Sequence, residues 1–284
     1  MHATVLWMDL LGYKSWLLAQ HSLSTSASQL EEALCIAFET LATRYDSILI
    51  GGIKTHLISD TIIAYVEGKP SEAIKPLTLL YQLLAARLHA LGLGIRGALA
   101  YGPIFIGESH PHLVLGSTIV KCAELEKEID AFAVVIDVSF IEGLLKLCDQ
   151  SELDEAIPYM PEIVISMKSG SANNRVIPYF IPQVAECMVV NYQSLIDAMR
   201  QEKPNSAQNL RAFIKKFIGS KHMIDTLIDD PAFFNGEISS NKKALLDSLE
   251  RVKSTWPMAI QHAELMLSVH GGESVDSAMK RWHR

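Results

Sequence analysis

Apolar positions in the first hundred residues follow two alternating patterns. Short runs rich in β-branched and aromatic side chains predict buried strands, at residues 4–8, 47–54, 58–66 and 94–100. Longer stretches that repeat apolar residues every three or four positions predict amphipathic helices, at residues 25–45 and 71–91. In chain order these elements read β-α-β-β-α-β, so we predict an α+β fold with a ferredoxin-like core.

Two aspartates lie at related places in this predicted core. Asp9 ends the first strand in the context WMDLLGY, and Asp60 lies close to the start of the third in LISDTII. In a ferredoxin-like sheet the first and third strands are antiparallel neighbours at the centre. The end of one strand then meets the start of the other, so we expect Asp9 and Asp60 to converge on one edge of the sheet.

The pattern beyond this core predicts further elements and a domain boundary. A helix is expected at residues 117–129, a strand at 132–136 and a helix at 138–147, and strands at 162–167 and 175–181 form a hairpin around the turn SGSANN. After about residue 185 the composition becomes helical throughout. We therefore predict a domain at residues 1–185 and a helical extension at 186–284, whose amphipathic tail suits packing or dimerisation.

Composition and charge narrow the function classes. The chain has 284 residues, of which 49% are hydrophobic and 20% charged, as in ordinary folded proteins. A net charge of −7 and a pI of about 5.8 argue against a protein that grips a nucleic-acid backbone. They also disfavour a palm-like nucleotidyltransferase, which needs a basic groove for its primer. A small anionic ligand remains compatible with this charge.

Cysteine usage and the opening segment bear on location. Four cysteines lie far apart without a C-x-x-C pair, and we interpret them as free buried thiols in a reducing compartment: Cys35, Cys122, Cys148 and Cys187. The opening segment lacks the basic start of a signal peptide. No run reaches the roughly 18 uncharged apolar residues of a membrane span. We therefore expect a cytoplasmic protein without membrane insertion.

The two aspartates carry the strongest chemical signal. A carboxylate beside a buried apolar strand is costly unless it has a partner. Two of them at one sheet edge can hold a pair of divalent cations for phosphoryl chemistry. The alternative is that Asp9 caps the following helix and Asp60 occupies a hairpin turn. Gly12 then permits a tight turn into that helix, whose free N–H groups can cradle a polyphosphate.

Other candidate chemistry is weaker. His110 and His112 form an H-x-H pair in a proline-containing loop, but no third metal ligand lies near them in the sequence. Ser59 has no evident histidine partner, so nucleophilic catalysis lacks support.

Four segments together resemble class III nucleotidyl cyclases: DLLGY, SDTIIAYV, IRGALAYG and GSTIVKCAELE. They look most similar to the bacterial branch that includes the pyrimidine cyclases of Pycsar antiphage defence, and the resemblance spans residues 4–137. It implies a homodimer with composite sites between the subunits. It also implies conversion of a nucleoside triphosphate to a 3′,5′-cyclic monophosphate and pyrophosphate.

The resemblance implies roles for the matching residues. Asp9 and Asp60 would bind two divalent ions per site, Mn²⁺ or Mg²⁺, with the backbone carbonyl of Leu10 as a further ligand. Arg96, the arginine that opens R-G-A, would support the phosphates or the base, and the alternative is a surface charge on a strand. Lys168 in the hairpin would bind phosphate, and the alternative is an exposed hairpin lysine. The phosphates would also meet the backbone amides of Leu11, Gly12 and Tyr13.

Departures from the family pattern point to the substrate. Purine cyclases read their base with a lysine and an aspartate, and these positions are here His56 and Leu113. A pyrimidine triphosphate, UTP or CTP, is therefore favoured, with His56 donating to a base carbonyl; the alternative is a half-buried strand histidine. The transition-state donors of the family, spaced N-x-x-x-R, fall on Val120 and Glu124.

The sequence therefore predicts a metal-dependent pyrimidine nucleotide cyclase that makes cUMP or cCMP as an antiphage signal. A separate effector protein would read that product. Because Val120 and Glu124 replace polar and cationic donors, the alternative is a catalytically weak or inactive cyclase-like protein that binds nucleotide or serves as a dimeric scaffold. Turnover separates the two, since both would bind nucleotide and metal.

Overall fold

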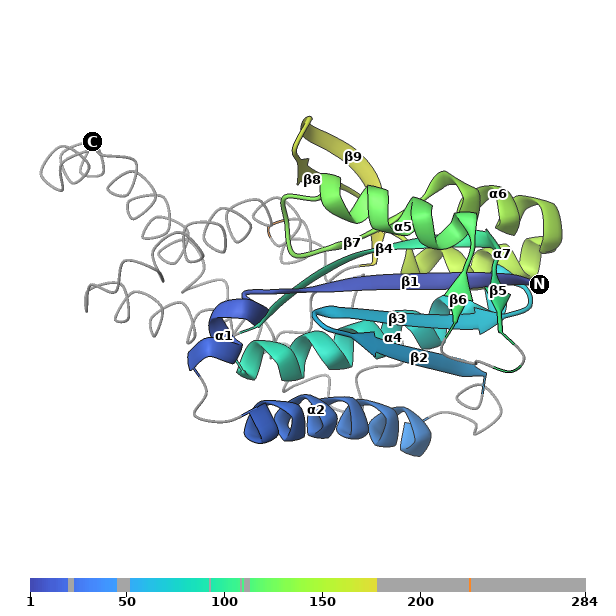
Figure 1. The fold of residues 1–284 in the computed structure, drawn as a ribbon. Coiled ribbons are helices and arrows are strands. Elements are labelled where there is room, and N and C mark those ends of the chain that lie inside the picture. Colours follow the sequence, from blue (N-terminus) through green and yellow to red (C-terminus); the bar gives the residue numbers. More distant parts are fainter. Residues whose placement is uncertain are drawn as a thin grey trace, which may run out of the picture.

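A seven-stranded sheet with the order β2-β3-β1-β4-β7-β9-β8 organises the described part of the chain (Figure 1). Neighbouring strands are antiparallel except β4 and β7, which are parallel. A hairpin of β5 (Phe105–Ile106) and β6 (Val114–Leu115) forms a separate small sheet. The seven strands are β1 (His2–Leu11), β2 (Ile53–Ile58), β3 (Thr61–Glu67), β4 (Gly94–Pro103), β7 (Val134–Ile136), β8 (Glu162–Met167) and β9 (Gly170–Ile177).

The computed structural model describes residues 1–19, 23–44, 52–91, 93–107 and 113–177, with the single positions 109 and 225. The predicted boundary at residue 185 lies outside the described residues, and so does the helical extension at 186–284 apart from position 225. His110, His112 and Cys187 also lie outside them.

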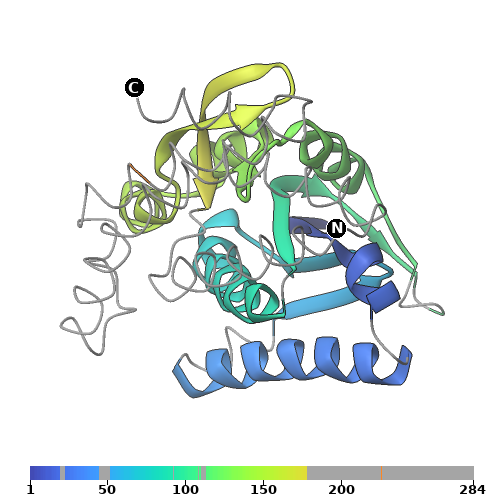
Figure 2. The same cartoon turned by 90° about the vertical axis from the view of Figure 1, so that its left-hand side faces the viewer.

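Helices lie on both faces of the sheet. Helix α4 packs against β1, β3 and β4, and α2 packs on α4, so both lie on the same side of the sheet (Figure 2). Helix α5 packs on β1 and β4 from the opposite side (Figure 1). None of the described helices combines the length and the apolarity that crossing a bilayer requires. The helices are α1 (Tyr13–Ala19), α2 (Leu23–Arg44), α4 (Pro70–Ala90), α5 (Ser117–Glu128), α6 (Val138–Leu147) and α7 (Gln150–Ala156), followed by the 3-10 turn η1 (Ile157–Tyr159).

Alternation along β1 divides the core into two layers. Leu6 and Met8 belong to the large apolar cluster on the α4 side, whereas Val5 belongs to a smaller cluster that includes Cys122 of α5. Both faces of β1 are therefore buried, which explains its nearly continuous apolar sequence. Successive side chains of a strand point to opposite faces. Asp9 consequently shares the α5 face with Val5.

The predicted α+β fold and its ferredoxin-like strand order are confirmed. β1 lies between β3 and β4 and is antiparallel to both, and β2 pairs with the far edge of β3. The apolar periodicity identified these elements because each strand or helix buries a regular face against the next layer.

Two strand boundaries differ from the predicted ones. β1 continues past Asp9, because the two residues that follow still pair with β4. The break between the second and third strands lies at residues 59–60, whereas the predicted break at residues 55–57 belongs to β2. Ser59 adopts a φ of 58°, the left-handed conformation that a tight hairpin turn requires. The chain therefore reverses immediately before β3.

The hairpin of β8 and β9 turns earlier than predicted. Lys168 and Ser169 form the turn, and Gly170 already begins β9. Gly170 has a φ of 123°, which residues with a Cβ rarely adopt, so this glycine closes the turn. Asn173 and Asn174, predicted as turn residues, pair with β8 instead.

The three described cysteines differ in exposure. Cys122 is buried, and burial raises the pKa of its thiol, so it acts as a packing residue. Cys148 is half-buried and Cys35 is exposed, so the expectation of buried thiols is wrong for Cys35. The reason is that Cys35 lies off the buried stripe of α2, which consists of Leu30, Ala33, Ala37 and Leu41.

Helix α7, which the sequence pattern did not predict, begins with a capping box. The Asp149 carboxylate accepts a hydrogen bond from the Glu152 backbone N–H at 3.0 Å, and the Glu152 carboxylate accepts one from the Asp149 N–H at 2.9 Å. Asp149→Ala is expected to lower the free energy of unfolding by about 1 kcal/mol. Urea denaturation measures this loss. Asp154→Ala, an exposed change on the same helix, is the control, and an equal loss there would contradict the role of the cap.

Candidate functional site

The ends of β1 and the β2–β3 turn bring Asp9 and Asp60 together. Asp9 pairs with Thr61 across the β1–β3 ladder, so Asp60 is one residue from its cross-strand partner. The backbone N–H of Leu10 donates to the Asp60 carbonyl oxygen at 2.7 Å, which ties the turn to the strand. The sequence-based expectation that these two residues converge therefore agrees with the strand register.

Arg96 is the cross-strand partner of Asp9 on the other side of β1. The two residues face each other in the β1–β4 ladder, and Arg96 Nη2 lies 3.5 Å from Asp9 Oδ2. Only 12% of the Arg96 side chain and 22% of the Asp9 side chain are exposed. Arg96 is thus not a surface charge, and it places a guanidinium directly against one of the candidate metal ligands.

Glu126 completes this cluster, although no sequence motif singles it out. Its side chain is 7% exposed and pairs closely with Arg96 Nε. Arg96 Nη1 also donates to the carbonyl oxygen of Ile129 at 2.8 Å. A signal was available, because Thr118, Cys122 and Glu126 form the buried stripe of α5 at four-residue spacing. A carboxylate on such a stripe requires a cationic partner.

Charges around Glu126 act on its carboxyl in opposite directions. The pKa of Glu126 is raised overall: burial raises it most, the Arg96 guanidinium lowers it, and the nearby Asp9 raises it. Lys168 also lowers the pKa of Glu126, so its ammonium lies within electrostatic reach of the cluster. The Lys168 side chain is exposed, and its backbone N–H donates to the carbonyl oxygen of Glu128 at 2.7 Å. The β8–β9 turn is therefore attached to the end of α5.

The turn after β1 is open. Gly12 has a φ of 87°, and a Cβ there would meet no atom within 4 Å. The Gly12 carbonyl oxygen accepts from the Trp16 N–H at 2.9 Å, which starts α1 immediately after the turn. Leu11 still pairs with β4, and Tyr13 begins the helix. These three predicted phosphate contacts thus lie next to Asp9 in the chain.

His56 lies on the same face of the sheet as Asp9. It pairs with Ile63 of β3, which in turn pairs with Trp7 of β1, two residues before Asp9. Its ring stacks on Tyr65 with centroids 5.9 Å apart and planes 8° from parallel. His56 is half-buried, so its geometry fits both the predicted base contact and the structural alternative.

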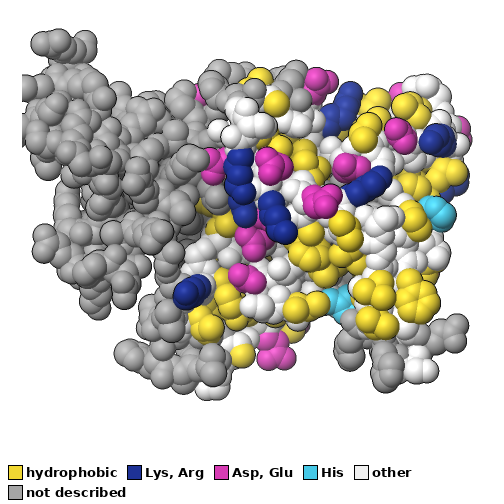
Figure 3. All heavy atoms as spheres, turned by 45° about the horizontal axis from the view of Figure 1, so that its top comes forward, with side chains coloured by type: hydrophobic (Ala, Val, Ile, Leu, Met, Phe, Trp, Pro, Cys, Tyr) yellow, Lys and Arg dark blue, Asp and Glu magenta, His cyan; other side chains and the backbone are white. Residues whose placement is uncertain are grey.

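Val120 and Glu124 lie on the exposed side of α5. The side of α5 that packs on the sheet carries Thr118, Cys122 and Glu126. Val120 is 55% exposed, and Glu124 is exposed as well. Figure 3 shows hydrophobic and charged side chains intermixed on this face of the molecule. Both residues therefore point away from the cluster at Arg96 within the same chain.

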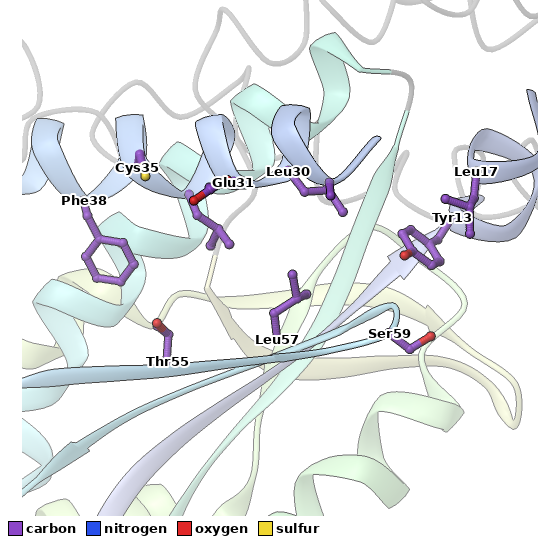
Figure 4. Close-up of a pocket in the computed structure, with 11 residues that line it drawn as sticks. Tyr13, Leu17, Leu30, Glu31, Cys35, Phe38, Thr55, Leu57 and Ser59 are labelled. Carbon is purple, nitrogen blue, oxygen red and sulfur yellow. The ribbon is translucent and has the colours of Figure 1, made fainter. Parts of the chain in front are cut away.

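A cavity of about 680 Å³ lies against the face of β2 that is opposite to the His56 side chain. Figure 4 shows side chains of α2 on one side and Thr55, Leu57 and Ser59 on the other. Thr55 and Leu57 flank His56 in β2, so the cavity and His56 lie on opposite faces of the sheet. The cavity thus lies on the opposite face of the sheet from the Asp9 cluster, and Tyr13, one of the predicted phosphate contacts, is among its lining residues.

The carboxylates of Asp9 and Asp60 suit a metal ion that takes its remaining ligands from a phosphate and water. Within the residues that the structure describes, no group of three or more His, Cys, Asp or Glu side chains is placed to hold a metal ion. Mg²⁺ commonly takes one or two protein carboxylates and completes its shell with substrate phosphates and water. Asp9 and Asp60 can supply such a pair.

Comparison with known proteins gives structural similarity only. No family model matches the chain, and no curated protein matches it. The guanylate cyclase domain of RhGC from Catenaria anguillulae, solved with GTP, is similar at 14% identity and a TM-score of 0.41, over 62% of this chain and 95% of that one. The monomeric guanylyl cyclase domain of RhoGC from Blastocladiella emersonii is similar at 14% identity and a TM-score of 0.40, over 62% of this chain and 94% of that one.

A bacterial light-regulated adenylyl cyclase is similar at 15% identity and a TM-score of 0.42, over 68% of this chain and 57% of that one. At such identities the activities of those proteins do not transfer to this chain. Its own residues define an α+β domain in which Asp9, Asp60 and the partly buried Arg96 lie at one sheet edge.

Proposed function

We propose that this chain is a metal-dependent nucleotide cyclase that converts UTP or CTP to the 3′,5′-cyclic monophosphate and pyrophosphate. The observation that carries the proposal is the convergence of Asp9 and Asp60 at one sheet edge, beside the guanidinium of Arg96. In this proposal the cyclic nucleotide is an antiphage signal that a separate effector protein reads.

The proposed reaction is an attack of the ribose 3′-hydroxyl on the α-phosphorus. The 3′-oxygen–phosphorus bond forms, the bond from the α-phosphorus to the bridging oxygen breaks, and pyrophosphate leaves while the hydroxyl proton passes to solvent. Asp9, Asp60 and the Leu10 carbonyl would hold Mn²⁺ or Mg²⁺, which when bound makes the hydroxyl a better nucleophile and neutralises phosphate charge.

In this proposal, further groups of the chain bind the phosphates and the base. Lys168 extends from a turn attached to the end of α5, where its ammonium can approach the phosphates. In this proposal the amides of Leu11, Gly12 and Tyr13 would meet the same phosphates. His56 lies on the Asp9 face, where its ring can donate to a pyrimidine carbonyl.

A homodimer with composite sites is part of the proposal. Val120 and Glu124 occupy the exposed side of α5, where a second copy of the chain could meet them. Neither supplies a donor to a transition state, since one is apolar and the other anionic. Lys121 and Lys127 are exposed cations on α5, and Lys121, beside Val120, can take such a role.

Val120 and Glu124 also favour a second candidate function. A cyclase-like domain whose α5 presents Val120 and Glu124 can bind nucleotide and metal without turning the nucleotide over. Losing one preorganised donor typically costs roughly 100- to 1,000-fold in rate. The two functions therefore differ in product formation and not in binding.

Incubation of the purified chain with ATP, GTP, CTP and UTP in Mn²⁺ tests the proposal. We expect a cyclic pyrimidine monophosphate, identified by mass and by retention against authentic 3′,5′-cyclic and 2′,3′-cyclic standards. A cyclic purine product would replace the pyrimidine assignment. Metal-dependent nucleotide binding without any product would favour the non-catalytic candidate.

A further inference from the structure

We propose that Arg96 is an internal counter-ion of Asp9 that competes with the divalent ion, and that Glu126 is the positioning residue that draws Arg96 away from it. The inference rests on the proposed function, because it takes Asp9 as a metal ligand. It goes beyond that function by assigning how metal and triphosphate binding depend on each other.

The contacts of Arg96 are unequal. Its Nε pairs closely with Glu126, which is 7% exposed, and its Nη1 donates to the Ile129 carbonyl oxygen at 2.8 Å. Its Nη2 lies 3.5 Å from Asp9 Oδ2, a longer contact to a carboxylate that is 22% exposed. Both short contacts come from the end of α5 and the residues just after it. The Asp9 contact is therefore the one that can open while Arg96 stays attached.

A divalent ion on Asp9 cannot leave this contact unchanged. Mg²⁺ sits about 2.0–2.1 Å from a carboxylate oxygen, on the same group that Arg96 approaches to 3.5 Å. Two cations at such separations repel each other, most strongly where little water screens them. Metal binding without nucleotide then has to displace Arg96 from Asp9.

A bound triphosphate removes the cost of displacing Arg96 from Asp9. Its oxygens offer the guanidinium a new anionic partner close to Asp9, as bidentate arginine–phosphate pairing allows. Arg96 can turn toward the phosphate while Glu126 and the Ile129 carbonyl hold the rest of its guanidinium. Metal and triphosphate should therefore strengthen each other's binding, and the coupling is reciprocal.

Glu126 sets the strength of this competition. As an anion it shares the charge of Arg96 with Asp9. An uncharged residue at position 126 leaves Asp9 as the carboxylate that pairs with Arg96, which should weaken metal binding. Removing both members of the pair takes the guanidinium away from Asp9, which should strengthen metal binding without nucleotide. The two changes thus move the Mn²⁺ affinity in opposite directions, and general damage to the fold would weaken both.

The experiment titrates the full chain with Mn²⁺ alone and measures free Mn²⁺ by electron paramagnetic resonance. Relative to the wild-type chain, we expect Glu126→Gln to weaken Mn²⁺ binding about tenfold and the double variant Arg96→Met/Glu126→Leu to strengthen it about tenfold, both within the usual range of coupling between sites. The double variant is expected to fold, because buried ion pairs tolerate apolar replacement. It decides the question by itself if Glu126→Gln does not fold.

Two controls separate the possible failures. Lys146→Gln/Glu142→Gln neutralises an exposed ion pair on α6 and should leave Mn²⁺ binding unchanged. Asp9→Asn should weaken it strongly. If Asp9→Asn weakens binding but the double variant does not strengthen it, the counter-ion role is wrong and the metal site stands. If Asp9→Asn has no effect, the metal site of the proposed function is wrong, and the inference falls with it.

Discussion

Asp60→Asn is expected to lower the rate of cyclic nucleotide formation by roughly 100- to 1,000-fold. A bound metal contributes several kcal/mol of charge stabilisation to a transition state, and each 1.36 kcal/mol corresponds to about tenfold in rate. Asn keeps the size and the hydrogen-bonding oxygen of Asp60 but removes the charge that attracts the ion. Initial rates with the triphosphate that the wild-type chain converts, at fixed Mn²⁺, measure the effect.

A matched substitution shows whether the loss belongs to the site. Asp154→Asn makes the same chemical change at an exposed position on α7 and is expected to keep the wild-type rate. Both variants should unfold at nearly the same temperature as the wild-type chain, because the Asp60 carbonyl that Leu10 uses is part of the backbone. An Asp60→Asn protein with full activity would mean that this carboxylate holds no metal.

Gly97→Ala is expected to lower the free energy of unfolding by about 3 kcal/mol. A Cβ at Gly97 would overlap the backbone carbonyl oxygen of Trp7 and crowd the Cα of Met8 on β1. β1 is hydrogen-bonded on both sides, by β3 and β4, so it cannot move aside without breaking a ladder. Strain therefore spreads through the centre of the sheet.

Thermal unfolding measures this loss as a fall in Tm of roughly 6–12 °C for a domain of this size. Gly170→Ala is the matched control, because a Cβ there meets no atom within 4 Å and only the positive φ of 123° is unfavourable. We expect a smaller loss from that change. Equal losses in the two variants would contradict the close approach to β1 as the reason why position 97 is a glycine, since Gly97 itself has no positive φ.

Much of the fold followed from local patterns in the chain. The apolar run that begins β1 and the leucine spacing of α4 each predicted their element, because burying one regular face needs a regular sequence. The convergence of Asp9 and Asp60 followed from strand order alone. Boundaries were less predictable, since the left-handed turn at Ser59 depends on where the β2–β3 ladder ends.

Some site residues could be predicted because a single sequence motif indicates their role. Others could not, because their role depends on contacts between different strands and helices. Asp9, Asp60 and Gly12 stand out in the sequence through their immediate neighbours. Arg96 had two open interpretations, and its contacts with Asp9 and Glu126 exclude the exposed one.

The periodicity of apolar residues was enough to predict the strand and helix order, and that order predicts that the backbones of Asp9 and Asp60 come close at one sheet edge. The tertiary structure alone decided that Arg96 lies between Asp9 and Glu126, and that Val120 faces outward on α5. The physical reason is the range of the interactions. Periodicity reflects burial within one element, whereas a buried ion pair forms only when β1, β4 and α5 pack together and exclude water from their shared end.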